Sequence, residues 1–130
     1  MDEPLIRFEA QPLKVKLKTT FRHAGATRNE GESVWVKAER NGISGFGEGC
    51  PRSYVSGDDL DSSVRWIQEL FAIGAWHFST FEALKKWVEE NSDRIDEYPS
   101  AWCAVEMAFL DLLARERNWA VEKLLDLNLN

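Results

Sequence analysis

The sequence has few of the residues from which disulfide-linked or metal-binding proteins are built. Among its 130 residues there are two cysteines, two histidines and four prolines. Cys50 and Cys103 do not form a Cys-x-x-Cys pair, which excludes a disulfide framework and favours a reducing, cytoplasmic setting. His23 and His77 are far apart and lack the ligand spacing of a zinc site, so we expect no metal in this chain.

Long apolar runs and a surplus of positive charge are also lacking. The most apolar stretch, around residues 101–113, is interrupted by Glu106 and Asp111 and is too short and too charged to span a membrane. The formal net charge is −6. This argues against nucleic-acid binding, which needs Lys and Arg to neutralise phosphates. The first residues carry neither a basic nor an apolar segment, so we expect no signal peptide.

The pattern of the sequence changes near Gly57. Before it, apolar and charged residues alternate with a period of two over residues 6–17 and 33–39, which is typical of half-buried strands. Asn41-Gly42 predicts a tight hairpin turn, and residues 43–50 predict a third strand. These elements form an antiparallel meander.

Two irregular segments are predicted beside these strands. Residues 19–29 are too long for a tight turn and read as a loop, and residues 51–58 follow the third strand. Pro12 predicts a bend or an edge strand. The meander would place both segments at one end of the sheet, where they form a natural binding rim. An ordinary surface position is an equal alternative for His23. The candidate substrate-binding residues of this rim are Phe21, Arg22, His23, Arg28, Arg52 and Tyr54.

After Gly57 the apolar spacing becomes helical. Helices are predicted over about 58–74, 79–90, 99–117 and 120–127, with a break at residues 91–93. Ser79-x-x-Glu82 predicts a capping box at the start of the second helix. The third is apolar nearly all round and should be buried between neighbours. The sequence therefore predicts one α+β domain: a three-stranded antiparallel meander in residues 1–57, then a three- to four-helix bundle in residues 58–130.

The glycine-rich segment at 45–49 invites a nucleotide-binding interpretation that its context does not support. A dinucleotide fingerprint needs a strand, a glycine turn and a helix in succession. Here Cys50-Pro51 follows the last glycine, and no helix begins before about residue 58. The alternative is a strand thinned by glycine so that another backbone packs closely against it.

The remaining polar residues do not assemble a catalytic site. Glu106 and Asp111 are five positions apart on a helix, so they lie on different faces and are not an acid–base pair. At least one of them is expected to pair with Arg115, which follows Asp111 by four residues. Cys103 is expected to pack as a small apolar residue. Cys50 has no base nearby in the sequence to make it a nucleophile. No catalytic residue is therefore expected in this chain.

Several segments, in this order, resemble the N-terminal capping domain of the enolase superfamily. The branch is the mandelate racemase and muconate-lactonizing enzyme group, which includes the dipeptide epimerases. The segments are Thr-Phe-Arg-His at 20–23, Glu-Ser-Val-Trp-Val at 32–36, Gly-Phe-Gly-Glu-Gly-Cys-Pro-Arg at 45–52, the apolar stretch at 100–113, and Val-Glu-Lys-Leu-Leu at 121–125.

The resemblance implies a division of labour between this domain and a (β/α)₈ barrel. In the family the barrel carries the carboxylates that hold Mg²⁺ and the base that removes a proton next to a carboxylate. The capping domain carries neither, and its two rim segments shape the substrate pocket. The resemblance thus implies a specificity domain of a Mg²⁺-dependent isomerase, epimerase, racemase or lyase that acts on a small carboxylate or dipeptide.

The sequence stops at Asn130, which leaves no room for the roughly 200 or more residues of a barrel. We therefore expect a capping domain without its barrel, inactive by itself, with the barrel, the substrate and further copies of itself as partners and a dimer as the simplest oligomer. The alternative is a free-standing protein-interaction module with the same fold.

Overall fold

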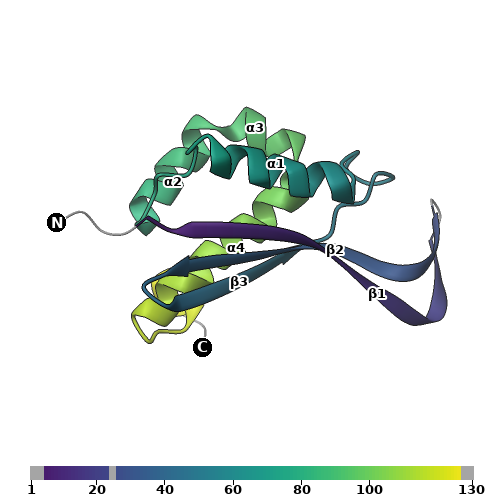
Figure 1. Ribbon diagram of the computed structural model, residues 1–130, viewed down its shortest axis with the longest axis horizontal. Helices are drawn as coiled ribbons and strands as arrows, with labels where there is room; N and C mark the ends of the chain where they lie inside the picture. The colour runs from purple at the N-terminus through teal and green to yellow at the C-terminus, as the bar shows by residue number, and fades with distance from the viewer. Residues whose placement is uncertain (1–4, 24–25, 127–130) are drawn as a thin grey trace.

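The computed structural model describes residues 5–126 except 24 and 25, and for residues 20–30 it describes the backbone alone. Three strands come first and helices follow (Figure 1). The strands are β1 (Arg7–His23), β2 (Ala26–Arg40) and β3 (Ile43–Gly49), and the helices are α1 (Leu60–Ala72), α2 (Phe81–Glu90), α3 (Ser92–Glu97), α4 (Pro99–Glu116) and α5 (Val121–Leu124).

The strands form one antiparallel sheet in the order β1-β2-β3, as predicted. Ala10, Val36 and Gly47 lie side by side across it. Alternate residues of β2 are buried, and Val34, Val36 and Ala38 have no exposed surface. Asn41 and Gly42 close the β2–β3 turn with φ angles of 53° and 78°, the left-handed conformation that such a two-residue hairpin requires.

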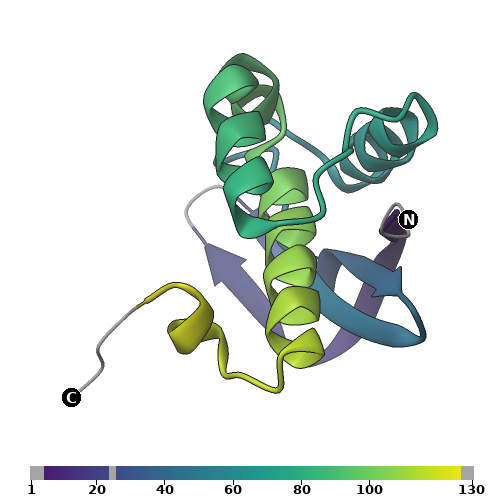
Figure 2. The same cartoon turned by 90° about the vertical axis from the view of Figure 1, so that its left-hand side faces the viewer.

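One face of the sheet is covered by α1 and α4. In Figure 2, α4 (light green) runs through the centre of the molecule, with α1 (teal) beside it. α4 contacts β2 and β3, whereas α1 contacts β1 and β2. The burial predicted for the apolar third helix is confirmed for one side only: Ala104, Val105 and Ala108 are fully buried, whereas Met107 is 47% exposed.

β3 lies against α4 with no room for side chains between the two backbones. A Cβ atom built on Gly47 would collide with the carbonyl oxygen of Ala104, and one built on Gly49 with the carbonyl oxygen of Ser100. The close approach predicted from the glycines is therefore confirmed, and the approaching backbone is that of α4.

Beyond the contact between β3 and α4, large aromatic side chains fill the space between the sheet and the helices. Trp87 on α2 stacks on Trp102 of α4 with ring centroids 4.7 Å apart, and Phe78 meets Phe109 edge to face at 4.9 Å. Such pairs contribute roughly 0.5–1.5 kcal/mol each beyond the area they bury. Most of the tryptophans thus belong to the core of this domain.

The helices begin and end close to the predicted positions, with three differences. α5 ends at Leu124, short of the predicted end near residue 127. The chain breaks at Asn91 as predicted but then forms the short helix α3, which the sequence pattern did not indicate. The predicted capping box on Ser79 is wrong by one residue. Thr80 has the extended conformation of an N-cap, and its Oγ1 accepts a hydrogen bond from the backbone N–H of Ala83 at 3.1 Å. At the start of α1, hydrogen bonds from Ser62 to Asp59 lower the pKa of that carboxyl.

The prediction of a loop at residues 19–29 is wrong, because β1 continues to His23 and β2 begins at Ala26, and the two pair as strands. They form a hairpin that projects beyond the end of β3 (Figure 1). Threonines and an aromatic residue in this stretch favour strands despite its loop-like polarity. The register shifts between Lys16 and Phe21. Among the residues that the structure describes, β1 pairs with β2 alone, so the edge position predicted from Pro12 is confirmed.

Candidate functional site

The two predicted rim segments lie at the same end of the sheet, on the right in Figure 1. The last residue pair between β2 and β3 joins Val34 to Gly49, whereas β2 pairs with β1 as far as Ala26. Eight residues of extended strand correspond to roughly 25 Å. The hairpin therefore reaches well beyond the end of β3.

In the hairpin the backbone pairing brings two of the predicted residues, Phe21 and Arg28, directly opposite each other. Arg22 lies opposite Thr27, and His23 opposite Ala26. The side chains of these residues fall outside the part of the chain that the structure describes.

Arg52, the first predicted residue of the second segment, contacts the backbone of the hairpin. Its Nη1 atom donates to the carbonyl oxygen of Glu32 at 2.7 Å and to that of Pro51 at 2.7 Å. Glu32 lies two residues past the end of the β2–β3 pairing. The guanidinium thus takes the place of a strand neighbour at the exposed edge of β2.

The segment 51–58 is fixed at both ends and exposed in the middle. The carbonyl oxygen of Arg52 accepts the backbone N–H groups of Val55 and Ser56, both at 2.9 Å. Ser56 Oγ donates to Oδ1 of the buried Asp58, whose Oδ2 atom is also buried and has no partner among the described residues. Between these ties Tyr54 is 38% exposed and Val55 73% exposed.

A polar cleft of about 500 Å³ lies where the hairpin meets the start of α1. Its charged residues are of both signs, and the sequence pattern did not single out this group. The lining residues are Lys14, Glu32, Asp59, Leu60, Asp61, Ser62 and Arg65.

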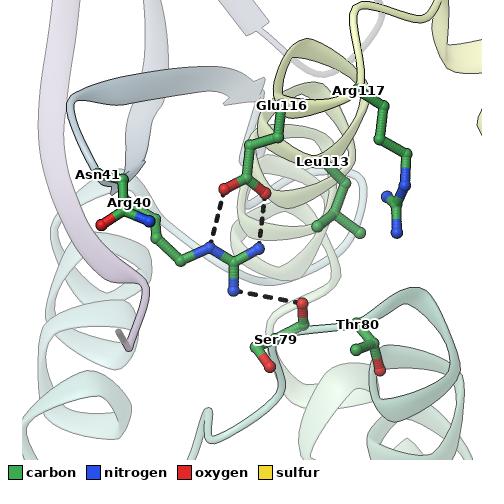
Figure 3. A pocket seen from close by; sticks show the side chains of 7 residues that line it. All are labelled: Arg40, Asn41, Ser79, Thr80, Leu113, Glu116 and Arg117. Carbon is green, nitrogen blue, oxygen red and sulfur yellow. Dashed lines mark hydrogen bonds and ion pairs between the residues drawn. The ribbon is translucent and has the colours of Figure 1, made fainter. Parts of the chain in front are cut away.

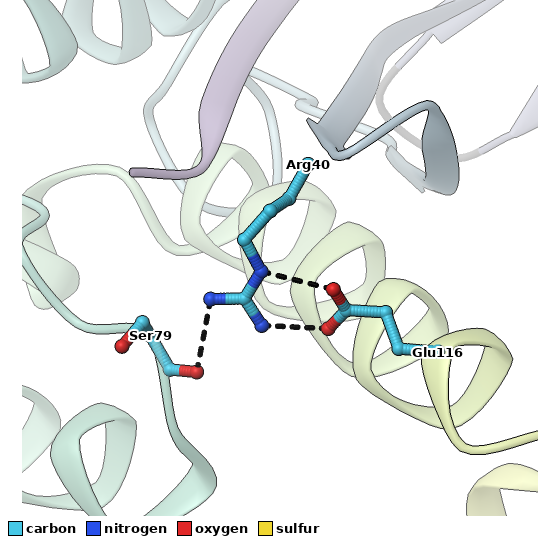
Figure 4. Close-up of polar contacts among 3 residues, drawn as sticks. All are labelled: Arg40, Ser79 and Glu116. Atoms are coloured by element: carbon cyan, nitrogen blue, oxygen red, sulfur yellow. Dashed lines mark hydrogen bonds and ion pairs between the residues drawn. The ribbon is translucent and has the colours of Figure 1, made fainter. Parts of the chain in front are cut away.

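At the opposite end of the sheet, the structure shows a buried ion pair that the sequence did not predict. Arg40 Nε donates to Glu116 Oε2 at 2.9 Å, and Nη2 donates to Oε1 at 2.6 Å (Figure 4). Nη1 donates to the carbonyl oxygen of Ser79 at 3.3 Å. Figure 3 shows these residues on the wall of a cavity of about 280 Å³. Because three donors of Arg40 are engaged by the protein, this side chain ties β2 to α4 and to the segment that leads into α2.

The other two carboxylates of α4, those of Asp111 and Glu106, also have structural partners. Asp111 Oδ1 accepts from Arg115 Nε at 3.0 Å, which confirms the predicted ion pair. Its Oδ2 accepts the backbone N–H of Phe46 at 2.9 Å and so holds β3 on the helix. Glu106 Oε2 accepts from Trp102 Nε1 at 2.8 Å.

The expectation that Cys103 packs as a small apolar residue is wrong, because the side chain lies on the exposed side of α4. Its Sγ atom is 3.8 Å from Met107 Sδ. Partial burial, with smaller effects from Glu106 and Cys50, raises the pKa of the Cys103 thiol. Cys50 is exposed as well.

Within residues 5–126, leaving out 24 and 25, no three His, Cys, Asp or Glu side chains are grouped so as to hold a metal ion. In the same part of the chain no helix has the length and apolarity needed to cross a membrane.

Known proteins with this arrangement are epimerases and lactonizing enzymes. No protein-family model matches the chain. The hydrophobic dipeptide epimerase of Enterococcus faecalis is 32% identical over 114 residues, which is 86% of this chain and 31% of the relative. Its structural counterpart is the dipeptide epimerase of the same organism complexed with Mg and L-Leu-L-Tyr, with a TM-score of 0.75, 30% identity, and coverage of 96% of this chain and 34% of that one.

A muconate-lactonizing enzyme of Mycobacterium smegmatis complexed with muconolactone gives a TM-score of 0.80 at 25% identity, with coverage of 96% of this chain and 33% of that one. The chain thus spans about a third of the length of the curated relatives it matches.

The three-stranded meander backed by α1 and α4 is the fold of an enolase-type N-terminal domain. The chain is an N-terminal domain of the enolase superfamily, of the kind found in the mandelate racemase and muconate-lactonizing enzyme group, and curated relatives that it matches are named as dipeptide epimerases.

Proposed function

We propose that this chain is the substrate-specificity domain of a dipeptide epimerase and that it works with a (β/α)₈ barrel. The observation that carries the proposal is that most of the chain matches about one third of the length of proteins that are named as dipeptide epimerases. In this proposal residues 1–57 supply the sheet and the rim, and residues 58–130 supply the helices that support them.

The metal chemistry belongs to the barrel in this proposal. The relative from Enterococcus faecalis is described with Mg and a dipeptide. The described residues of this chain do not group into a metal site, so they do not fit the ion. A divalent cation stabilises the negative charge that develops when a proton leaves carbon next to a carboxylate.

What this chain would contribute is recognition of the dipeptide. Phe21 and Tyr54 would give apolar contact to its side chains, whereas Arg22, His23 and Arg28 would attract its terminal carboxylate. Both rim segments continue from strands of the sheet, and loops and strand ends of this kind are a usual placement of binding residues. The interaction-module alternative has no support in the relatives, which are named as enzymes.

Turnover assays test the proposal. The 130-residue chain and a protein that joins it to a (β/α)₈ barrel would each be incubated in D₂O with a panel of L,L-dipeptides and Mg²⁺. We expect deuterium at the α-carbon and D-epimers only with the joined protein. Turnover by the chain alone would contradict the division of labour, and a joined protein that is folded but inactive on every dipeptide would contradict the substrate class.

A further inference from the structure

The two rim segments are far apart in the sequence, yet one side chain joins them. The β2–β3 pairing ends at Val34, so the carbonyl of Glu32 faces the edge of β2 that β3 no longer covers. Arg52 supplies the missing donor at 2.7 Å and holds the carbonyl of Pro51 with the same nitrogen. An open sheet edge of this kind needs polar groups to satisfy it.

The main chain of Arg52 has a second role. Its carbonyl oxygen accepts the N–H groups of both Val55 and Ser56 at 2.9 Å, which closes the turn that carries Tyr54. Pro51 and Asp58, at the two ends of the segment, are buried. The exposed apex at Tyr54 is therefore held by one residue that also binds the hairpin.

The hairpin itself needs such support. Beyond the end of β3 it is a two-stranded ribbon, and such a ribbon is marginally stable at best in water. Residues 13–16 of β1 are exposed, so packing against the rest of the domain gives this stretch little support. A hydrogen bond from a charged donor is stronger than one between neutral groups. The 2.7 Å bond from Arg52 to the carbonyl of Glu32 therefore helps to fix the position of the ribbon.

We propose that Arg52 is a positioning residue that couples segment 51–58 to the β1–β2 hairpin, so that both halves of the rim keep one relative placement. Its guanidinium is engaged by the backbone of Glu32 and Pro51 and acts on the substrate through Tyr54 and the hairpin residues. One consequence of this coupling is that the preference among dipeptides depends on it. Only that consequence rests on the proposed function.

The coupling is tested in the 130-residue chain without any activity. Spin labels at Ser53→Cys and Thr27→Cys, in a Cys50→Ser/Cys103→Ser background, report the distribution of distances between segment 51–58 and the hairpin. We expect a narrow distribution with Arg52, a broad one in Arg52→Met, and partial recovery in Arg52→Lys, which keeps a cationic donor. Arg94→Met, on the exposed side of α3, removes the same groups elsewhere and should leave the distribution narrow. An equally narrow distribution in Arg52→Met would overturn the coupling.

The consequence for specificity is tested with the barrel-joined protein. For two dipeptides that differ in one side chain, Arg52→Met should change the ratio of kcat/KM by roughly tenfold, mainly through KM, whereas Arg94→Met should not. An equal loss for all dipeptides would overturn the positioning role and leave Arg52 a general structural residue. If the protein with Arg52 epimerises no dipeptide, the proposed function fails, while the distance measurement still decides the coupling.

Discussion

Arg40 and Glu116 form a buried two-pronged ion pair, with 2.6 Å between Nη2 and Oε1, that joins the end of β2 to the last turn of α4. Their side chains are 7% and 18% exposed. Guanidinium and carboxylate match in shape, which makes this arrangement strong once it is formed. The end of the sheet opposite the rim is therefore locked to both α4 and the entry of α2.

Arg40→Met should lower the free energy of unfolding by up to about 3 kcal/mol, because it leaves the largely buried charge of Glu116 without its partner. The double variant Arg40→Met/Glu116→Leu should recover much of that loss. Urea denaturation of the four proteins of the cycle measures both values. Lys86→Met is the control, since it breaks an exposed pair of 3.9 Å with Glu90 that contributes about 0–1 kcal/mol. A single-variant loss as small as that of the control would contradict the structural role.

Gly47→Ala should destabilise the domain by about 3 kcal/mol or more, because the new methyl group meets the backbone of α4 and a backbone cannot turn aside. Gly31→Ala is the matched control. A Cβ atom there would lie 3.6 Å from the nearest atom, Val15 O, which is ordinary contact. Thermal unfolding compares the two variants, and equal melting temperatures would contradict the close approach of β3 and α4.

The two thiols should be alkylated at different rates, and the difference should depend on pH. The raised pKa of Cys103 means that less of it is thiolate at a given pH, so it should react more slowly than Cys50 near neutral pH. Its rate should still be rising as the pH passes 9.0, the ordinary thiol value. Peptide mass spectrometry after timed iodoacetamide treatment measures both rates, with Cys50→Ser and Cys103→Ser as controls. Equal rates across the pH range would contradict the environment described for Cys103.

Arg22→Ala and Tyr54→Ala should change the preference of the barrel-joined protein among dipeptides and leave the fold intact, because both residues lie at the rim. Trp119→Ala is a control, since this aromatic residue after α4 is exposed to a similar extent, 40%. Far-ultraviolet circular dichroism and kcat/KM over the panel are the readouts. Unchanged preference in both rim variants would remove them from the binding site.

The isolated chain should self-associate through the face of the sheet that the helices leave open. Leu13, Val15 and Phe46 are 40%, 55% and 42% exposed, and the ring of Phe46 lies beside that of Trp35. Exposed apolar patches favour association, and symmetric dimers are its commonest form. Light scattering over a dilution series should show a dimer that Val15→Glu weakens, with Val55→Glu, away from the sheet, as the control. A monomer at all micromolar concentrations would contradict the expectation.

Local patterns predicted most of the fold. The alternation of Val34, Val36 and Ala38 predicts a strand with one buried face, and Asn41-Gly42 predicts its turn. The same alternation would have placed Arg40 on the buried face. Its partner Glu116 is 76 positions away, and no local pattern shows such a pairing.

The rim was predicted less well. Residues 19–29 have the composition of a loop, and only pairing between β1 and β2 makes them strands. Arg52 was predicted as a rim residue, but its bond to the carbonyl of Glu32 has no signal in the sequence, because every residue offers the same backbone group. The surface position of Cys103 depends on which side of α4 faces the sheet, and the nearly uniform apolarity of that helix conceals it.

The most direct measurement exchanges the capping domain of the Enterococcus faecalis dipeptide epimerase, 30% identical, for this chain and determines kcat/KM over a dipeptide panel. If this chain is a specificity domain, the chimera epimerises dipeptides with an order of preference that differs from that of the parent, and Arg52→Met alters this order. A folded, active chimera that keeps the parent's preference unchanged would contradict the claim that this chain selects the substrate.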